Sequence, residues 1–273
     1  MKTQISKIWI RLSFLAGVLM FFVSGAGILF KSTYAKETVS WASQAMGQDL
    51  INVFLIFPLL VICLYLMRKG SWRAILVWLG ILIYMVYCYA LYAFFIHFGP
   101  LFLIYIVILG LSFYSLIGGM MQIDKEEIRQ NLIGHSHRPA SIFLMTVSGL
   151  FFLLWLADIL RALITGSLPQ GVSDIGLLVN PVQVLDLALL LPASTIISIL
   201  LWKQKSLGYV LAVPLMIFFA TMGIAIVCMM FILSQKGFPA PIPQMIMMGV
   251  IIVADVAIIR NFLKGSKING SNR

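Results

Sequence analysis

The stretch that decides the fold is RKGSWRAILVWLGILIYMVYCYALYAFFI, residues 68–96. From Ala74 to Ile96 it contains no charged side chain. A helix needs about 20 apolar residues to cross the hydrocarbon core of a bilayer, so this stretch predicts a transmembrane helix. The basic residues Arg68, Lys69 and Arg73 precede it in a short turn, which is typical of loops on the cytoplasmic side.

The composition of the whole chain is that of a protein dissolved in lipid. Of its 273 residues, 62% are hydrophobic and only 10% are charged, whereas a soluble domain has about 25% charged residues. Little of the chain lies outside apolar stretches, so we expect no soluble domain of useful size. The formal net charge of +10 is typical of basic loops in membrane proteins. It therefore indicates the lipid bilayer as partner, and not nucleic acid.

Eight apolar runs predict an all-α polytopic membrane helix bundle. They cover residues 12–30, 51–67, 74–96, 101–121, 142–164, 187–202, 208–233 and 245–259. If the N-terminus is inside, the inner loops receive 15 Lys and Arg residues and the outer loops receive 4. Since Lys and Arg accumulate on the cytoplasmic side, we expect both termini in the cytoplasm. The first run is also compatible with a signal peptide, although it is longer than the usual apolar core of one.

Two segments of the chain are alike and predict an internal repeat. Each has Asp-Leu at its start, a proline inside and a basic turn after it: Asp49, Pro58 and Arg68–Ser71 in one, Asp186, Pro192 and Lys203–Ser206 in the other. We interpret them as parts of two four-helix units, residues 1–133 and 134–273. With an even number of spans each, the units would be parallel repeats about an axis along the membrane normal. The alternative is chance recurrence of these residues at helix ends.

Several of these motifs also resemble those of a known group of proteins. They are Gly47-Gln48-Asp49-Leu50, Arg68-Lys69-Gly70-Ser71, the segment Tyr84–Tyr92 and NPVQVLDL at residues 180–187. Over about residues 47–233 the chain is similar to a family of bacterial multi-pass membrane proteins with no established activity. The resemblance implies a bacterial inner membrane. The family often has histidine at the position of Gln183, so the resemblance argues against a metal or proton role for Gln183.

Ionisable side chains within the apolar runs are candidates for chemistry, because they are costly in lipid. Asp255 lies deepest, and we expect it to serve either as a proton or cation relay or in an interhelical hydrogen bond. Asp158 and Arg161 share one helix face, so the expected structural role is an ion pair between them. Asp49 and Asp186 stand where their runs begin, where carboxylates favour a helix N-terminus. We therefore expect these two to cap their helices.

Tyrosine and amide side chains predict a cavity that opens to the outer side. The third run carries four tyrosines, followed by His97, and this number exceeds what a simple interfacial belt requires. We expect these tyrosines to line the cavity together with the polar residues that precede the sixth run. The complete candidate polar site consists of Asp158, Arg161, Asp186, Gln183, Asn180, Asp255, Tyr84, Tyr87 and His97.

Patterns for a metal or a cofactor are weak. The loop motif His135-Ser136-His137 has neither nearby cysteine nor a helical HExxH arrangement. The sequence contains no phosphate-binding glycine loop. We therefore predict no cofactor, no metal and no catalytic residues.

Three classes of function stay open. A transporter or permease for an ion or small solute is favoured by the repeat and by the prolines in the second and sixth runs; a chain of this size would then be expected to work as a homodimer. A non-catalytic membrane subunit that binds a partner is the second class. A membrane-embedded enzyme acting on lipid is the third, and we expect no enzyme, because convergent His, Asp or Glu residues are lacking. One cavity lined by Asp255, Asp158 and Asp186 would favour transport, whereas dry pairing of each would favour the partner-binding subunit.

Overall fold

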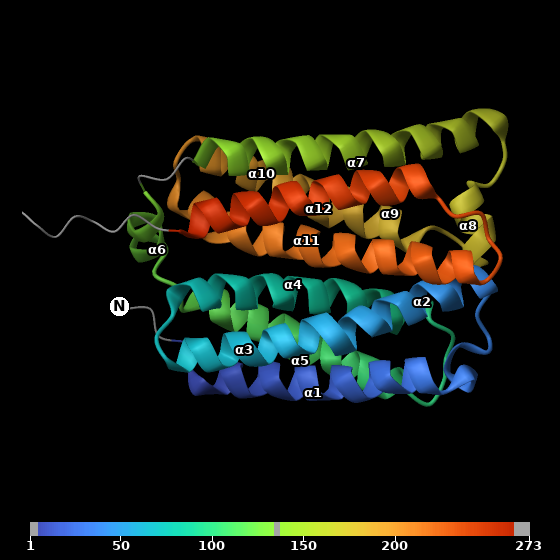
Figure 1. Cartoon of the computed structure of the whole chain (residues 1–273), viewed down its shortest axis with the longest axis horizontal. Helices are drawn as coiled ribbons and strands as arrows, with labels where there is room; N and C mark the ends of the chain where they lie inside the picture. The colour runs from blue at the N-terminus through green and yellow to red at the C-terminus, as the bar shows by residue number, and fades with distance from the viewer. Residues whose placement is uncertain (1–4, 134–136, 265–273) are drawn as a thin grey trace, which may run out of the picture.

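The computed structural model describes residues 5–133 and 137–264, and within them eight helices are long and apolar enough to cross a membrane. This confirms the predicted all-α membrane bundle. The long helices run side by side along one direction, with the first half of the chain on one side and the second half on the other (Figure 1). The spans are Lys7–Leu29, Val39–Arg68, Trp72–Phe95, Phe102–Met121, His137–Thr165, Pro181–Trp202, Ser206–Gln235 and Ile242–Leu263.

In the first part of the chain a 3-10 helix lies between the first two spans, and a π-helical turn lies inside the second span. The elements of this part are α1 (Lys7–Leu29), the 3-10 helix η1 (Lys31–Tyr34), α2 (Val39–Ile51), the π-helical turn η2 (Asn52–Ile56), α3 (Phe57–Arg68), α4 (Trp72–Phe95) and α5 (Phe102–Met121). The second span thus begins twelve residues before the predicted start at residue 51. The reason is local: Thr38 caps α2 by accepting from the backbone N–H of Trp41 at 3.2 Å.

The rest of the chain consists of α6, which links the fourth and fifth spans, and the elements of the last four spans. Its elements are α6 (Lys125–Leu132), α7 (His137–Thr165), α8 (Gln170–Ile175), α9 (Pro181–Leu185), the π-helical turn η3 (Asp186–Leu190), α10 (Leu191–Trp202), α11 (Ser206–Gln235) and α12 (Ile242–Leu263). Gly176 ends α8 in the left-handed conformation with φ 70°, and Pro181 opens α9 after the cap residue Asn180.

The loops of the bundle lie at two opposite ends (Figure 1). The α6 end carries the turns after α3 and α10 together with α6, and α1 begins there and α12 ends there. The α8 end carries η1, α8 and the loops that follow α4 and α11. The basic loops predicted to face inward therefore share the α6 end, and the predicted outer loops share the α8 end.

The two π-helical turns stand at corresponding places in the two halves. Asp186 opens η3 134 residues after Asn52 opens η2 (186 − 52), and Pro192 follows Pro58 at the same spacing. In each turn the next backbone N–H donates to the carbonyl five residues earlier, so the helix holds one extra residue. This wider turn lies just before a proline, which lacks an N–H and crowds the carbonyl of the preceding turn.

This spacing pairs other residues of the two segments than the sequence pattern does. The sequence pattern aligned Asp49 with Asp186, but the π-helical turns align Asn52 with Asp186 and Asp49 with Gln183. The tight turns that follow agree with the second register. Gly70 and Gln204, again 134 residues apart (204 − 70), both take the left-handed conformation, with φ 84° and 54°.

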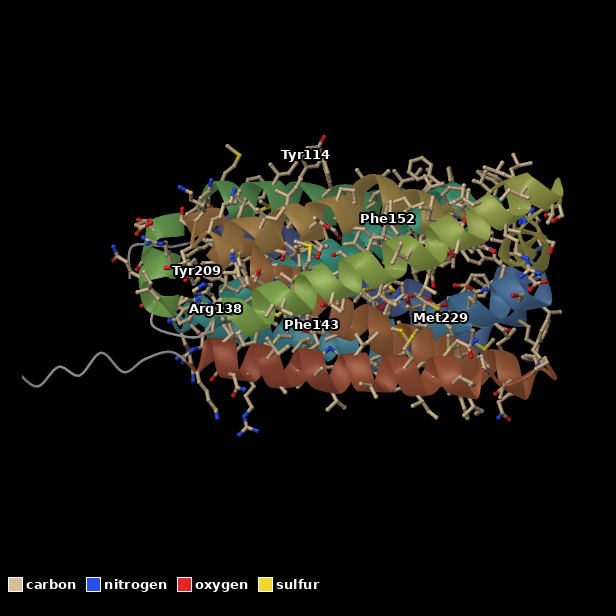
Figure 2. The ribbon with its side chains drawn as sticks, turned by 90° about the horizontal axis from the view of Figure 1, so that it is seen from above. Tyr114, Arg138, Phe143, Phe152, Tyr209 and Met229 are labelled. Atoms are coloured by element: carbon tan, nitrogen blue, oxygen red, sulfur yellow. The ribbon has the colours of Figure 1, made fainter. Side chains whose placement is uncertain are left out.

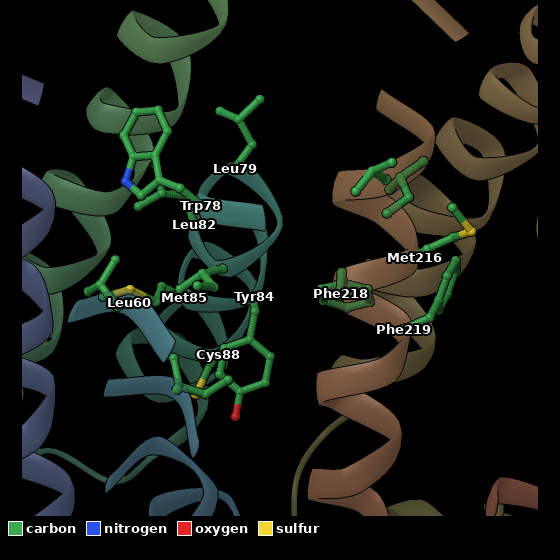
Figure 3. Packing of buried hydrophobic residues seen from close by; sticks show 14 of the residues in the cluster. Leu60, Trp78, Leu79, Leu82, Tyr84, Met85, Cys88, Met216, Phe218 and Phe219 are labelled. Carbon is green, nitrogen blue, oxygen red and sulfur yellow. The ribbon is translucent and has the colours of Figure 1, made fainter. Parts of the chain in front are cut away.

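The two halves meet mainly where α4 and α2 pack against α11. A side chain on Gly80 of α4 would collide with the Pro214 carbonyl and with Ile217 of α11, and one on Gly47 of α2 would collide with the Met229 backbone. Glycine therefore permits both close approaches. Figure 3 shows the apolar packing on each side of this boundary, including Phe218, which directs its ring toward α4.

The spans differ strongly in how deeply they are buried. In the most apolar window of α4, 72% of residues are buried, against 28% in α7 and 17% in α12. Figure 2 shows α12 along the edge of the bundle, with side chains that point away from the bundle. It also labels Phe152, which belongs to α7. α4 is thus the central helix, and α7 and α12 are peripheral ones.

Candidate functional site

A cavity of about 490 Å³ lies between the two halves, in the part of the bundle toward the α8 end. α2 and α4 form the wall on the first-half side, and α7, α11 and α12 form the opposite wall. Asn180 and Val182, from the segment between α8 and η3, line it as well. The lining is predominantly apolar, with a few amide, hydroxyl and carboxyl groups. This size and composition are those of a small-molecule site.

Among the residues that the structure describes, Asp186 is the single carboxylate that lines the cavity. Its two oxygens accept separate hydrogen bonds, one from the Tyr87 hydroxyl at 2.8 Å and one from the Trp155 indole N–H at 2.9 Å. The side chain is 7% exposed. Because it opens the π-helical turn η3 and is held from α4 and from α7, three elements set its position.

Asp186 does not cap a helix, so the predicted capping role is wrong. Asn180 performs that role: its side-chain oxygen accepts from the backbone N–H groups of Val182 at 3.0 Å and Gln183 at 3.3 Å. The sixth span begins at Pro181 rather than at residue 187, which places Asp186 inside the helix.

The structure divides the other predicted cavity residues into two groups. Tyr87, Tyr92 and Asn180 line the cavity with Asp186. Tyr84, Gln183 and His97 are not among the lining residues. His97 instead lies at the α8 end, where its backbone N–H and its Nδ1 atom contact the Glu37 carboxylate at 2.8 and 2.9 Å.

Asp49 forms a second, sealed carboxyl site that the sequence reasoning missed. It is fully buried and accepts hydrogen bonds from the hydroxyls of Tyr34 at 2.6 Å and Tyr92 at 3.0 Å. A side chain on Gly27 of α1 would collide with this carboxyl group. The predicted helix cap is wrong here too, because α2 begins ten residues earlier. Tyr92 also faces the cavity, so only one phenol ring separates Asp49 from it.

The Tyr34 hydroxyl of η1, which donates to Asp49, stays protonated. Burial raises the pKa of the Tyr34 phenol well above its ordinary value, and the adjacent Asp49 carboxyl raises it further. Tyr34 is therefore a lasting hydrogen-bond donor to Asp49.

A chain of polar side chains runs from the cavity wall to α1. Gln48 lines the cavity and donates to the Tyr84 hydroxyl. Tyr84 donates to the Asn52 side-chain oxygen at 3.0 Å, and Asn52 donates to the Ser24 hydroxyl at 3.0 Å. Asn52 and its counterpart Asp186 thus both accept from tyrosines of α4. Only the second position bears a carboxyl group.

The expected ion pair between Asp158 and Arg161 does not form; among the described residues the ion pairs are those of His97 and Arg129. Asp158 instead accepts from the Gln183 side-chain amide at 2.8 Å. Arg161 is exposed on α7. An amide from the neighbouring span therefore replaces the partner predicted on the same helix.

Asp255 lies away from the cavity lining and is fully buried. Neither of its oxygens has a hydrogen-bond partner among the residues that the structure describes. The expected interhelical hydrogen bond is thus not formed by these residues. Of the three carboxyl groups Asp158, Asp186 and Asp255, Asp186 alone is among the described residues that line the cavity, so the single shared cavity expected for a transporter is not found. The dry pairing expected for a partner-binding subunit is not complete either, because Asp255 has no partner among the described residues.

Comparisons with known proteins add no assignment. A scan against protein-family models, a search of curated proteins and a search of solved structures each found no match. The described ranges 5–133 and 137–264 also contain no group of three or more His, Cys, Asp or Glu residues that could hold a metal. Of the predicted histidine motif, His135 and Ser136 lie outside the described residues, and His137 opens α7 beside Tyr209, with 6.2 Å between the ring centroids.

Proposed function

We propose that this chain is a transporter or permease for a small solute, and that the cavity at Asp186 is its solute site. The proposal places the protein in a bacterial cytoplasmic membrane with both termini in the cytoplasm, as the distribution of Lys and Arg predicts. The observation that carries it is a cavity of ligand size between two halves of a membrane bundle, with a carboxyl group at the π-helical turn of a spanning helix.

The irregular backbone at the cavity supports this proposal. A π-helical turn inside a membrane is tolerated where protein packs against it or where it lines a cavity. π-helical turns inside α-helices occur frequently at functional sites. In this chain η3 borders the cavity with Asp186 and Leu190, so the π-helical turn coincides with the place where a solute would bind.

Closure of one end of the bundle is the second supporting feature. The cavity lies toward the α8 end, while toward the α6 end α4 and α11 approach closely at Gly80 and Pro214. A cavity toward one end of the bundle, with close helix packing toward the other end, is compatible with alternating access.

Efflux of a mixture of solutes from liposomes tests the proposal. Purified protein is reconstituted into liposomes loaded with a pool of neutral, anionic and cationic small solutes. The solutes that remain inside are followed by mass spectrometry, with and without an imposed pH gradient. We expect at least one solute to leave faster than from protein-free liposomes. Asp186→Asn should slow that efflux at least tenfold, because it removes the charge in the cavity.

Asp255→Asn is the matched control, because it neutralises a buried carboxyl group outside the cavity. Its efflux rate should equal that of the wild type. If no solute leaves faster than from protein-free liposomes although the protein is folded, the transport proposal fails. A membrane subunit that binds a partner would then be the better interpretation.

A further inference from the structure

We propose that the cavity takes an amphipathic organic cation, that is, one positive charge on an apolar body. This inference rests on the proposed function, because it names the solute class of the same site. Its basis is the meeting of one carboxylate, aromatic rings and methionine side chains in one predominantly apolar cavity.

The charge of the site is the first step. Asp186 lines the cavity, and within the described ranges 5–133 and 137–264 no Lys, Arg or His is among the lining residues. Both hydrogen-bond donors to its oxygens, Tyr87 and Trp155, are neutral. They orient the carboxyl group and leave its charge uncompensated. A carboxylate accepts about four hydrogen bonds, so the Asp186 oxygens keep acceptor capacity beyond these two bonds, and a cationic ligand would supply the missing counter-charge.

The aromatic lining is the second step. Trp41, Trp155 and Tyr87 border the cavity together with Phe218 and Phe219. Faces of aromatic rings attract cations, most strongly where the cation has lost its water. Tyr87 and Trp155 are also the two side chains that donate hydrogen bonds to Asp186. A cation placed at the carboxylate therefore lies next to aromatic rings as well.

The methionine side chains that line the cavity favour an apolar body for the ligand. Five methionines line the cavity, namely Met222, Met229, Met230, Met247 and Met248. Methionine is unbranched and adapts to different shapes, and such surfaces can repack around several partners. The site therefore selects a ligand by its positive charge and its apolar body rather than by one exact shape. Anions are disfavoured, because they would meet the carboxylate of Asp186.

Equilibrium binding tests the inference independently of transport. Isothermal titration calorimetry on detergent-solubilised protein would use tetraphenylphosphonium and the smaller benzyltrimethylammonium as cations. Tetraphenylborate is the anion of matching shape, and protein-free micelles provide the baseline. We expect the wild type to bind at least one of the two cations. Tetraphenylborate should bind at least tenfold more weakly than tetraphenylphosphonium or benzyltrimethylammonium, whichever binds more tightly.

The variants locate the binding. Asp186→Asn should weaken cation binding at least tenfold, whereas Asp255→Asn should bind as the wild type does. If neither cation binds, if the borate binds as tightly as the cations, or if Asp186→Asn leaves cation binding intact, the inference is overturned. Should Asp186→Asn fail to fold, the preference of the wild type for cation over anion still decides the question.

The two proposals fail in different ways. Efflux of a neutral or anionic solute without cation binding would keep the transport function and overturn the solute class. Cation binding without efflux of any solute would support the ligand class and overturn transport. Tight binding of tetraphenylborate would indicate a cavity that accepts any apolar molecule, such as a lipid chain.

Discussion

Replacing Gly47 with alanine is expected to destabilise the protein by about 2–3 kcal/mol or more, although it adds a single methyl group. Gly47 lies on α2, and an added Cβ would stand 2.6 Å from the Met229 Cα atom and 2.8 Å from the Met229 backbone nitrogen. Backbone atoms of a long helix cannot turn aside as a side chain can. Relief therefore requires α2 and α11 to separate, and this would open the boundary between the two halves.

Thermal unfolding in detergent, followed by tryptophan fluorescence, measures this effect. The matched control is Gly110→Ala in the middle of α5, where an added Cβ meets nothing within 4 Å. Alanine favours a helix over glycine by about 1 kcal/mol, so the control should unfold at the same temperature as the wild type or a higher one. Equal melting temperatures for Gly47→Ala and the wild type would mean that α2 and α11 do not pack this closely.

Asp49→Leu should also destabilise the protein by about 2–3 kcal/mol, because it removes the acceptor from a sealed polar site. The Tyr34 hydroxyl would lose its bond to Asp49, whereas the Tyr92 hydroxyl would keep the Ala45 carbonyl at 3.0 Å. A buried donor left without a partner costs about 1–3 kcal/mol. Leucine must also fit beside Gly27, where α1 leaves little space.

Two further variants separate this effect from a general intolerance of leucine. Asp49→Asn keeps one acceptor oxygen, so it should cost only about 1 kcal/mol. Asp255→Leu replaces a buried carboxyl group whose oxygens lack partners among the described residues. Its melting temperature should be unchanged or raised, because such a replacement removes an uncompensated polar group. If Asp49→Leu and Asp255→Leu had the same effect, the tyrosine bonds to Asp49 would contribute nothing to stability.

The architecture could be predicted from the sequence because each span is a long apolar run bounded by polar residues. The turn at residues 68–73 is such a boundary, and the structure ends α3 and begins α4 there. The errors fall where a helix continues through polar residues. The segment at residues 39–50 contains serine and glutamine, so hydropathy alone placed it in a loop. Its helix is stabilised by the Thr38 cap and by packing against α11.

The candidate site was harder to predict because its partners come from distant segments. Asp186, Tyr87 and Asn180 were expected to lie together, since all three were placed near the outer side. The bonds from Trp155 to Asp186 and from Tyr34 to Asp49 follow only from the packing of helices far apart in sequence. No spacing rule pairs residues on different spans. If residues 39–50 had been predicted as helix, Asp49 would have been placed inside a membrane span rather than at its start.

α4 carries the donors to both carboxyl groups, with Tyr92 at Asp49 and Tyr87 at Asp186 on one rigid, deeply buried helix. This arrangement has a thermodynamic consequence. A ligand that shifted α4 at Asp186 would also change the free energy of the hydrogen bonds at Asp49. Linkage is reciprocal, so a change of state at Asp49 that moved α4 would alter ligand affinity at Asp186 by a matching factor. Coupling between the two carboxyl groups would thus pass through one helix.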